Sequence, residues 1–394
     1  MLVFDEALKI VLSSAHSLGA EHVNIANAMG RVLAEDIESD IDMPPFDKSA
    51  MDGYACQRAD LGKELTVIET IPAAYVPKKT IQPGQCAKIM TGGMVPEGAD
   101  CVIMKEYVEM PAENTIRFVG EKTANNICKR AEDIKAGDIV LHKGTLLKPQ
   151  HIAVLASVGC ARPLVAKRPK VAVVATGNEL VEPTFKPGPA RIRNSNSFQL
   201  TAQIEGVGAI ATNYGIVSDT DKAIDSMFKK AVKENDVVII SGGVSVGDFD
   251  LVPGILRQNG FELLFEKIAI KPGKPTVFGL LDNVYCFGLP GNPVSMFVLF
   301  EILVKPFLYK LMGHNYRHPN IRMPLDETIR IKKPDRQRWL PAAITKAGTV
   351  KPVEYHGSAH IGSLCDAGGL ISIDAGVAEV EKGTIVPVRL FRDT

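Results

Sequence analysis

The chain has 394 residues, of which 46% are hydrophobic and 23% are charged. This composition is typical of a folded globular protein and excludes a disordered, collagen-like or coiled-coil chain. Lys and Arg together number 45, as do Asp and Glu, so the net charge is zero and no global positive field would attract nucleic acid. The length predicts two to four domains at roughly 100–200 residues each.

The seven cysteines lie far apart, without a Cys-x-x-Cys pair or a histidine at zinc-finger spacing. This pattern argues against a disulfide framework and against structural zinc, so we expect a reducing, cytoplasmic environment. Asp5, Glu6 and Lys9 interrupt the N-terminal apolar run, which argues against a signal peptide. The most apolar stretch, residues 294–300, is shorter than the roughly 20 residues of a membrane span, so no membrane association is expected.

Helical patterns before and after the β-type sequence of residues 46–134 predict a linker domain formed by residues 1–45 and 135–166. Apolar side chains recur on one helical face over residues 4–18. A second helix is expected over residues 25–37, and residues 148–157 again have a helical pattern.

The rest of the chain has three different secondary-structure patterns. Residues 46–134 contain short β-type runs between Gly- and Pro-containing turns, which predicts an inserted β-rich domain. Residues 167–315 alternate all-apolar strands, such as VAVVAT and DVVII, with helices, which predicts a doubly wound parallel sheet covered on both faces. Residues 316–394 predict a small C-terminal β barrel or sandwich. The expected fold class is therefore α/β plus β in a multidomain chain.

In a doubly wound sheet, ligands bind at the carboxyl ends of the strands, and three segments of this kind stand out. ATGNEL places Glu179 directly after a strand. SGGVSVGDFD offers glycines that let backbone amides approach an oxyanion, together with acids that suit Mg²⁺ shared with a substrate phosphate. KPGKP adds two lysines, and GLPGNP adds a turn at a helix start. The candidates in these last segments are Ser241, Gly242, Gly243, Ser245, Gly247, Asp248, Asp250, Lys271, Lys274, Pro290, Gly291, Asn292 and Pro293.

Each segment alone has a simpler interpretation as a tight turn, a helix N-cap or an exposed loop. Their convergence on one edge of the predicted sheet favours a phosphate–Mg²⁺ site. The spacing matches neither GxxxxGK(S/T) nor GxGxxG, which disfavours a P-loop NTPase and a Rossmann dehydrogenase. Elsewhere, Asp52, Thr91, Arg336 and Ser358 lie in turns or loops, where turn chemistry or solvation is the simpler interpretation.

Taken together and in order, PPFDKSAMDGYA, MTGGMVPEGAD, ATGNEL, SGGVSVGDFD, IKPGKP and GLPGNPVS resemble the molybdopterin molybdenumtransferase (MoeA) family, whose animal relative is the C-terminal part of gephyrin. The resemblance covers nearly the whole chain and implies a MogA-like α/β domain. It also implies Mg²⁺-dependent insertion of molybdate into adenylylated molybdopterin, with release of AMP. It further implies an elongated homodimer and an upstream MogA-type adenylyltransferase.

The resemblance carries over to individual residues. Asp52 and Thr91 are implied to face the cleft, and Glu179, Asp219 and Asp250 are implied to contact Mg²⁺ or the nucleotide. Lys271 and Lys274 match lysines that would offset charge on phosphate and molybdate. Implied substrate contacts are Ser241, Gly242, Gly243, Ser245, Gly247, Pro290, Gly291, Asn292, Pro293, Arg336 and Ser358.

The chain departs from the family pattern at 93–95, 130–133, 335–339 and 357–360, which bears on the insertion and the C-terminal region. Two other functions stay open: a molybdopterin adenylyltransferase, and a non-catalytic pterin carrier or scaffold. The sequence does not distinguish molybdate from tungstate, since both are tetrahedral oxyanions. It also does not divide the acids between Mg²⁺ and nucleotide.

Overall fold

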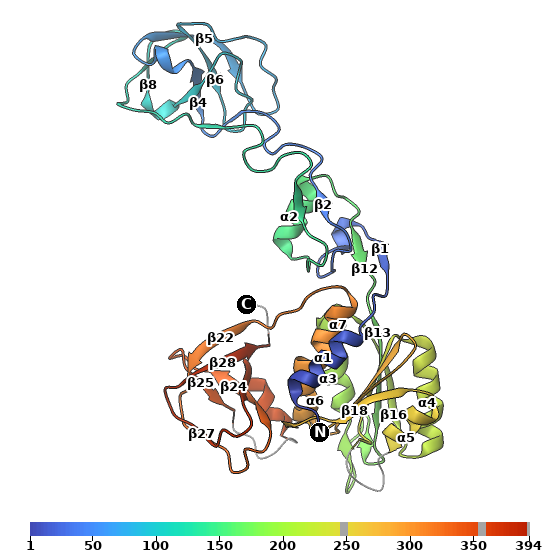
Figure 1. Ribbon diagram of the computed structural model, residues 1–394. Helices are drawn as coiled ribbons and strands as arrows, with labels where there is room; N and C mark the ends of the chain where they lie inside the picture. The colour runs from blue at the N-terminus through green and yellow to red at the C-terminus, as the bar shows by residue number, and fades with distance from the viewer. Residues whose placement is uncertain (245–250, 354–359, 392–394) are drawn as a thin grey trace.

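The computed structural model describes residues 1–244, 251–353 and 360–391 and shows an elongated molecule (Figure 1). A β-rich module formed by the segment between β2 (Ile37–Glu38) and β11 (Ile139–Leu141) occupies one end. The α/β region and the C-terminal β region lie side by side at the other end. A slender linker region connects the two ends, so the module touches neither large region in this view. Among the described residues, no helix is long and apolar enough to cross a membrane.

The first helix, α1 (Phe4–Ser14), has two acids in its first turn and buries Phe4, Ala7 and Val11 along one face. The spacing of three to four residues puts these side chains in one stripe. They join the main core of the α/β region, and the Tyr285 hydroxyl donates a hydrogen bond to the Ser14 carbonyl at 2.8 Å. The expected N-terminal helix is therefore confirmed, and it packs on the α/β region.

The linker region is mostly extended chain, and the helix expected over residues 25–37 is wrong. Gly30 adopts φ +74°, and the amides of Gly30 and Leu33 donate to the carbonyls of Leu147 and Thr145. These pairings with a distant segment replace the local hydrogen bonds of a helix. The region contains β1 (Ala20–His22), η1 (Ile25–Asn27), β2 (Ile37–Glu38), β11 (Ile139–Leu141), α2 (Pro149–Ser157) and β12 (Leu164–Ala166). Helix α2 confirms the third helix expected from the sequence.

The inserted module is a six-stranded sheet with a core on each face. Along β4, Tyr54 and Cys56 face one core, while Ala55 faces the other. This alternation is the period of two that a strand requires. The strand order is β7-β4-β6-β5-β9-β8, with β4 (Gly53–Cys56), β5 (Glu64–Ile71), β6 (Gln85–Ile89), β7 (Cys101–Met104), β8 (Val108–Ala112) and β9 (Thr115–Phe118); β3 (Lys48–Ser49) pairs with β10 (Ile127–Cys128) beside it.

The α/β region has a mixed sheet in the order β16-β13-β17-β21-β20-β18. The first four strands are parallel, as expected, whereas β20 runs antiparallel to them. The edge strand β18 is antiparallel to β20 and therefore runs in the direction of the first four. Only Asp282 and Asn283 separate β20 from β21, and so short a connection permits a hairpin but not a crossover. The strands are β13 (Lys170–Thr176), β16 (Ile210–Val217), β17 (Val237–Ser241), β18 (Glu262–Lys267), β20 (Pro275–Leu281) and β21 (Val284–Leu289).

Helices cover both faces of this sheet. One core contains buried residues of α1, α3, α6 and α7, and the other contains those of α4 and α5. A two-stranded flap of β14 and β15 projects after β13. The bounds are α3 (Asn196–Gly206), α4 (Asp221–Glu234), α5 (Leu251–Gln258), α6 (Pro293–Leu299), a π-helical turn (Phe300–Val304), α7 (Lys305–Leu311), β14 (Leu180–Val181) and β15 (Ile192–Arg193).

The C-terminal region forms its own sheet, in the order β19-β24-β26-β28-β22 with β25 beside β24. This path is open in the described residues, because its end strands β19 and β22 do not pair with each other, so the expected barrel is not confirmed. Its first strand, β19 (Ile270–Lys271), comes from the α/β region. The others are β22 (Asn320–Pro324), β24 (Gln337–Ile344), β25 (Val350–Pro352), β26 (Gly369–Ile373) and β28 (Ile385–Leu390); β23 (Ile329–Arg330) pairs with β27 (Glu379–Val380), and η5 (Ile361–Asp366) precedes β26.

The tight packing of β4 against β7 makes a stability prediction. A Cβ atom on Gly53 would lie 1.8 Å from the Ile103 carbonyl oxygen, so Gly53→Ala should destabilise the module by about 3 kcal/mol through overpacking. Gly62→Ala is the matched control, because no atom lies within 4 Å of its added Cβ. Urea denaturation, with hydrogen exchange of the β4–β7 amides, measures both; equal midpoints for the two variants would contradict the packing argument.

Candidate functional site

The carboxyl edge of the parallel strands holds a cavity of about 700 Å³. Residues of six separate segments line it, which supplies the convergence that the strand-end argument expected. One of those segments belongs to the C-terminal region and contributes Arg336. The cavity is lined by the predicted residues Glu179, Gly243, Lys271, Lys274, Pro290, Gly291, Asn292 and Arg336, and by Ile192, Val244, Pro272, Gly273, Pro275 and Ser295.

The glycine pair after β17 is required by close packing. Gly242 and Gly243 adopt φ values of +99° and +64°, and a Cβ on Gly242 would lie 2.6 Å from the Thr176 carbonyl oxygen. The Gly242 amide donates to the Leu289 carbonyl at 3.0 Å, so that amide is already bonded within the protein. This differs from the expected role of a free backbone donor at Gly242. The glycines instead let the β17 loop lie against β13.

Asn196 fixes two walls of the cavity relative to each other. Its side-chain amide donates to the Ser241 hydroxyl at 3.0 Å and to the Gly291 carbonyl at 2.7 Å. Ser241 itself is buried, which explains why it bonds Asn196 and does not line the cavity. The predicted Pro293 also does not line the cavity but forms the first turn of α6, where proline lacks only an amide that a helix leaves unpaired.

The basic wall comes from two strands of different regions. β19 pairs in parallel with β24, and this register places Lys271 opposite Arg338, two residues beyond Arg336. Burial, followed by the charges of Arg338 and Arg336, lowers the pKa of Lys271. The two arginine charges act in the same direction as burial, and the carboxylate of Asp335 opposes them. A bound anion would relieve this repulsion.

The acidic side consists of Glu179 and Asp219. Glu179 lines the cavity, while Asp219 accepts a hydrogen bond from the Asn178 amide at 3.1 Å and donates its own amide to the Asn178 side chain at 3.2 Å. Two carboxylates thus flank the end of β13. No group of three or more metal-ligating side chains occurs in the part of the chain that the structure describes. The predicted residues Ser245, Gly247, Asp248, Asp250 and Ser358 lie outside the described residues.

Asp52 and Thr91 form a second cluster, in the inserted module. Asp52 accepts hydrogen bonds from the Thr91 amide and hydroxyl, both at 2.8 Å, and its other oxygen lies 3.3 Å from the Lys105 amine. In that order of strength, these contacts lower the pKa of Asp52 to about 2. The cluster lies in the module at the far end of the molecule from the α/β region (Figure 1), so one chain does not bring it to the cavity.

Several residues of these sites were missed by the sequence argument. Asn196 and Ser295 lie within helical sequence and carry no strand-end signal. Lys105 directly follows β7, and it approaches Asp52 only because β7 pairs with β4. The starts of these two strands, Gly53 and Cys101, are 48 residues apart in the sequence. Ile192 lies on the flap after β13. Only Ser295 offered a hint, since it follows the GLPGNP turn by two residues.

Comparisons with known proteins agree along the whole chain. Family models match as the MoeA N-terminal region (domain I and II) at residues 2–159, a probable molybdopterin binding domain at 172–310, and the MoeA C-terminal region (domain IV) at 327–391. The chain is 39% identical to a molybdopterin molybdenumtransferase of Staphylococcus epidermidis, over 98% of this chain and 94% of that one. It is 36% identical to a Bacillus subtilis protein of the same name, over 99% and 94%.

Solved structures give the same picture of the fold. The molybdopterin biosynthesis moeA protein from Pyrococcus horikoshii OT3 superposes with a TM-score of 0.86 and 31% identity, covering 99% of this chain and all of that one. A molybdenum cofactor biosynthesis protein from Pyrococcus furiosus superposes with a TM-score of 0.63 at 23% identity, which supports the fold alone.

The Asp52 cluster predicts a titration. Thr91→Val removes the hydroxyl donor while the backbone amide remains, so the pKa of Asp52 should rise from about 2 toward 3.8. Because folding lowers this pKa, protonation favours the unfolded chain; the resulting stability is present above about pH 3.8 and is lost as the pH falls through about 2. Carboxyl-carbon NMR of the Asp52 side chain measures the midpoint, and an unchanged midpoint in Thr91→Val would refute the assignment.

Proposed function

This chain belongs to the MoeA family of molybdopterin molybdenumtransferases, and we propose which of its side chains bind each substrate. The chain is a transferase of molybdenum cofactor biosynthesis that inserts molybdenum. The proposal concerns its substrates, which we take to be adenylylated molybdopterin and molybdate, and the side chains that bind each of them. One observation carries it: acidic and basic side chains from three segments line a single cavity.

Molybdate binds at the basic wall. Lys271, Lys274 and Arg336 supply three positive charges to one cavity. Burial, and after it the charges of Arg338 and Arg336, lowers the pKa of Lys271. A divalent tetrahedral oxyanion neutralises this charge, and the arginine fork can donate two parallel hydrogen bonds to it. Because Arg336 belongs to the C-terminal region, that region takes part in oxyanion binding.

The phosphoanhydride of the adenylylated substrate lies toward the acidic side. Glu179 and Asp219 provide the hard oxygen ligands that Mg²⁺ prefers, and Mg²⁺ commonly takes one or two carboxylates together with substrate phosphates. When bound there, Mg²⁺ would neutralise phosphate charge. The Asn178–Asp219 hydrogen bonds hold the Asp219 carboxylate at the end of β13, while Asn196 keeps the glycine loop and the proline turn in register.

The reaction needs no covalent bond to the protein. Water cleaves the phosphoanhydride, and AMP leaves with the new oxygen on one of the two phosphorus atoms. The two thiols of the pterin dithiolene then bond to molybdenum, and one molybdate oxygen leaves as water with their two protons. Lys271 and Lys274 stabilise the charge that grows on the phosphate oxygens as the bond breaks. A MogA-type adenylyltransferase would supply the substrate. The scattered, free cysteines are consistent with our proposal that this takes place in the cytoplasm.

A second copy of the chain completes the site. β13 begins beside the linker region, and the parallel strands therefore point their carboxyl ends, and the cavity, away from the linker and the module (Figure 1). The Asp52–Thr91 cluster of the same chain lies in that module. We propose that a homodimer places the module of one subunit over the cavity of its partner, where Asp52 orients water or a metal-bound group.

A reconstitution assay tests the binding roles. With adenylylated molybdopterin, Mg²⁺ and molybdate, the protein should release AMP only when molybdate is present. Arg336→Ala should raise the KM for molybdate by roughly tenfold, the loss expected for one charge-assisted contact. Arg322→Ala, an exposed arginine on β22, is the control and should leave KM unchanged. Molybdate-independent AMP release, or equal KM values for the two variants, would sink the assignment; retained pterin binding without turnover in the parent protein would favour a carrier.

Mixing two inactive variants tests the dimer. Asp52→Ala and Lys271→Ala should each be inactive alone, because every site then lacks one contribution. After exchange of subunits at equal amounts, half the dimers are mixed and each has one intact site, so about a quarter of the parent activity should return. A chain that builds its site alone would give no recovery. Asp52→Ala mixed with Thr91→Ala is the matched control, since both changes lie in the module and no mixed dimer gains an intact site.

A further inference from the structure

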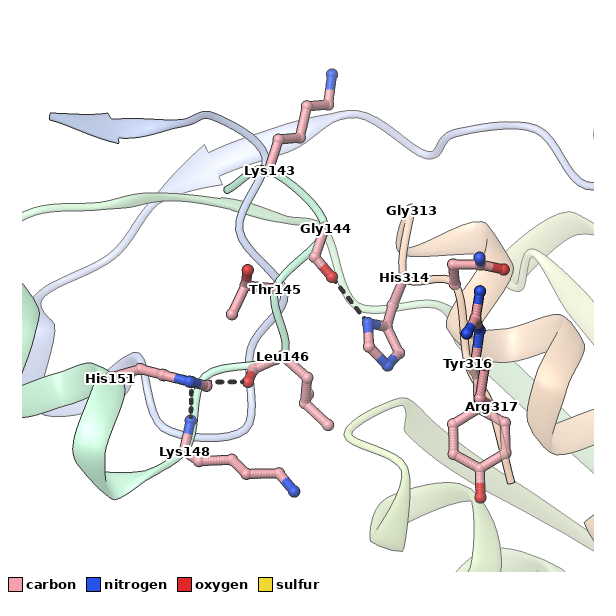
Figure 2. Close-up of a pocket in the computed structure, with 11 residues that line it drawn as sticks. Lys143, Gly144, Thr145, Leu146, Lys148, His151, Gly313, His314, Tyr316 and Arg317 are labelled. Atoms are coloured by element: carbon pink, nitrogen blue, oxygen red, sulfur yellow. Dashed lines mark hydrogen bonds between the residues drawn. The ribbon is translucent and has the colours of Figure 1, made fainter. Parts of the chain in front are cut away.

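A second cavity lies on the opposite side of the α/β region, where the chain leaves α7. It has a volume of about 550 Å³, and two segments line it: residues 143–151 of the linker region and residues 313–317. Figure 2 shows Lys148 and His314 reaching from opposite walls into the space between these segments. None of the residues that line this cavity lines the catalytic cavity.

The lining is basic. Lys143, Lys148, His151, His314 and Arg317 all contribute, and none of the described residues that line the cavity is acidic. Asp36 lies nearby but outside the lining: it accepts a hydrogen bond from the Lys143 amide at 2.6 Å and lies 3.6 Å from Nδ1 of His142. One carboxylate therefore serves the rim, while the cavity itself has only positive or neutral side chains.

The walls are held in place by hydrogen bonding and ring stacking. The Nδ1 atom of His314 lies 2.7 Å from the Gly144 carbonyl, so Nδ1 carries a proton and the imidazole bridges the two segments. Tyr316 stacks on Tyr309 with ring centroids 4.7 Å apart and an angle of 15°. The Lys148 amide and the Leu146 carbonyl both lie 3.1 Å from Nδ1 of His151 (Figure 2). These contacts fix the backbone and rings that form the walls, whereas a row of solvated lysines on a surface has no fixed arrangement.

We propose that this cavity binds a small phosphate-bearing anion. Lys and Arg side chains from two segments can donate charge-assisted hydrogen bonds to several phosphate oxygens at once. Leu146 and Tyr316 add an apolar wall beside the basic groups, which suits a small organic phosphate. The volume admits a small molecule and not a folded partner. The bound anion would join the linker region to the end of α7 and so stiffen the junction that carries the module.

This site is independent of the proposed reaction. It lies at the amino-terminal side of the sheet, beside the linker, whereas substrates bind at the carboxyl edge. The segment from Pro293 to Leu311 is one continuous buried helical run, and it begins beside Asn292 of the catalytic cavity and ends beside Gly313 of the second cavity. The two anion sites thus stand at the two ends of one helix.

The test uses inorganic pyrophosphate as the probe in isothermal titration. The full chain carrying Lys271→Ala serves as the parent, because this change weakens anion binding in the catalytic cavity. Arg317→Gln or Lys143→Gln, both exposed, should weaken pyrophosphate binding roughly tenfold, the loss of one charge-assisted contact. Lys346→Gln, an exposed lysine of the C-terminal region, is the matched control and should leave affinity unchanged. In the otherwise unaltered enzyme, Arg317→Gln should not change turnover.

Hydrogen exchange locates the bound anion. Pyrophosphate should slow exchange of amides within 143–148 and 313–317 in the Lys271→Ala parent, and Arg317→Gln should abolish that protection. The proposal fails if pyrophosphate does not bind the parent, if the two pocket variants bind as tightly as the Lys346→Gln control, or if protection appears elsewhere only. Titration with AMP in parallel distinguishes a nucleotide from a simple phosphate source, because tighter binding of AMP than of inorganic phosphate requires contacts to its organic part.

Discussion

The catalytic cavity depends on a pairing of only two residues, Ile270 and Lys271 of β19 with β24. This short parallel ladder is the contact through which the C-terminal sheet extends into the α/β region. It sets Lys271 opposite Arg338 and brings Arg336 into the same cavity. Like charges held so close repel each other, so the pairing is maintained by contacts elsewhere. The repulsion is stored at the place where an oxyanion substrate relieves it, which favours binding of an anion over an empty cavity.

The contacts that maintain the pairing lie directly beneath it. Trp339, next to Arg338 on β24, packs edge-on against Phe4 of α1 with ring centroids 5.3 Å apart. The Arg389 guanidinium lies 4.3 Å from the centre of the Trp339 ring and 6.0 Å from that of the Phe4 ring. Burial is the largest influence on Arg389 and lowers its pKa, and the buried cation over an indole contributes roughly 1–2 kcal/mol. The N-terminal helix therefore orients the C-terminal sheet, which explains why α1 packs on the α/β region.

Much of the fold could be predicted from local sequence patterns. The geometry of the site could not, because it depends on contacts between residues distant in the sequence. All-apolar runs located β13, β17 and β21, and the strand-end rule found seven of the residues that line the cavity. The strand PTVFGLL was also located, but its antiparallel direction was missed, because an apolar run has no direction. The two-residue connection Asp282-Asn283 was the available signal. Asn196 and Lys105 escaped because their partners are distant in sequence. The helix expected over 25–37 failed because its apolar residues face the core of an extended segment.

The direction of the parallel strands accounts for the arrangement of the whole molecule. The linker joins the amino-terminal ends of the strands, so the module it carries points away from the cavity at their carboxyl ends. A single chain thus separates Asp52 from Lys271, and in the homodimer that we propose a second chain would close the site. In that dimer, the angle of the linker would decide whether each module reaches its partner's cavity. Residues 143–151 of the linker meet the chain just after α7, where Nδ1 of His314 donates a hydrogen bond to the Gly144 carbonyl. An anion bound at this junction would act on the position of the module and not on the chemistry in the cavity.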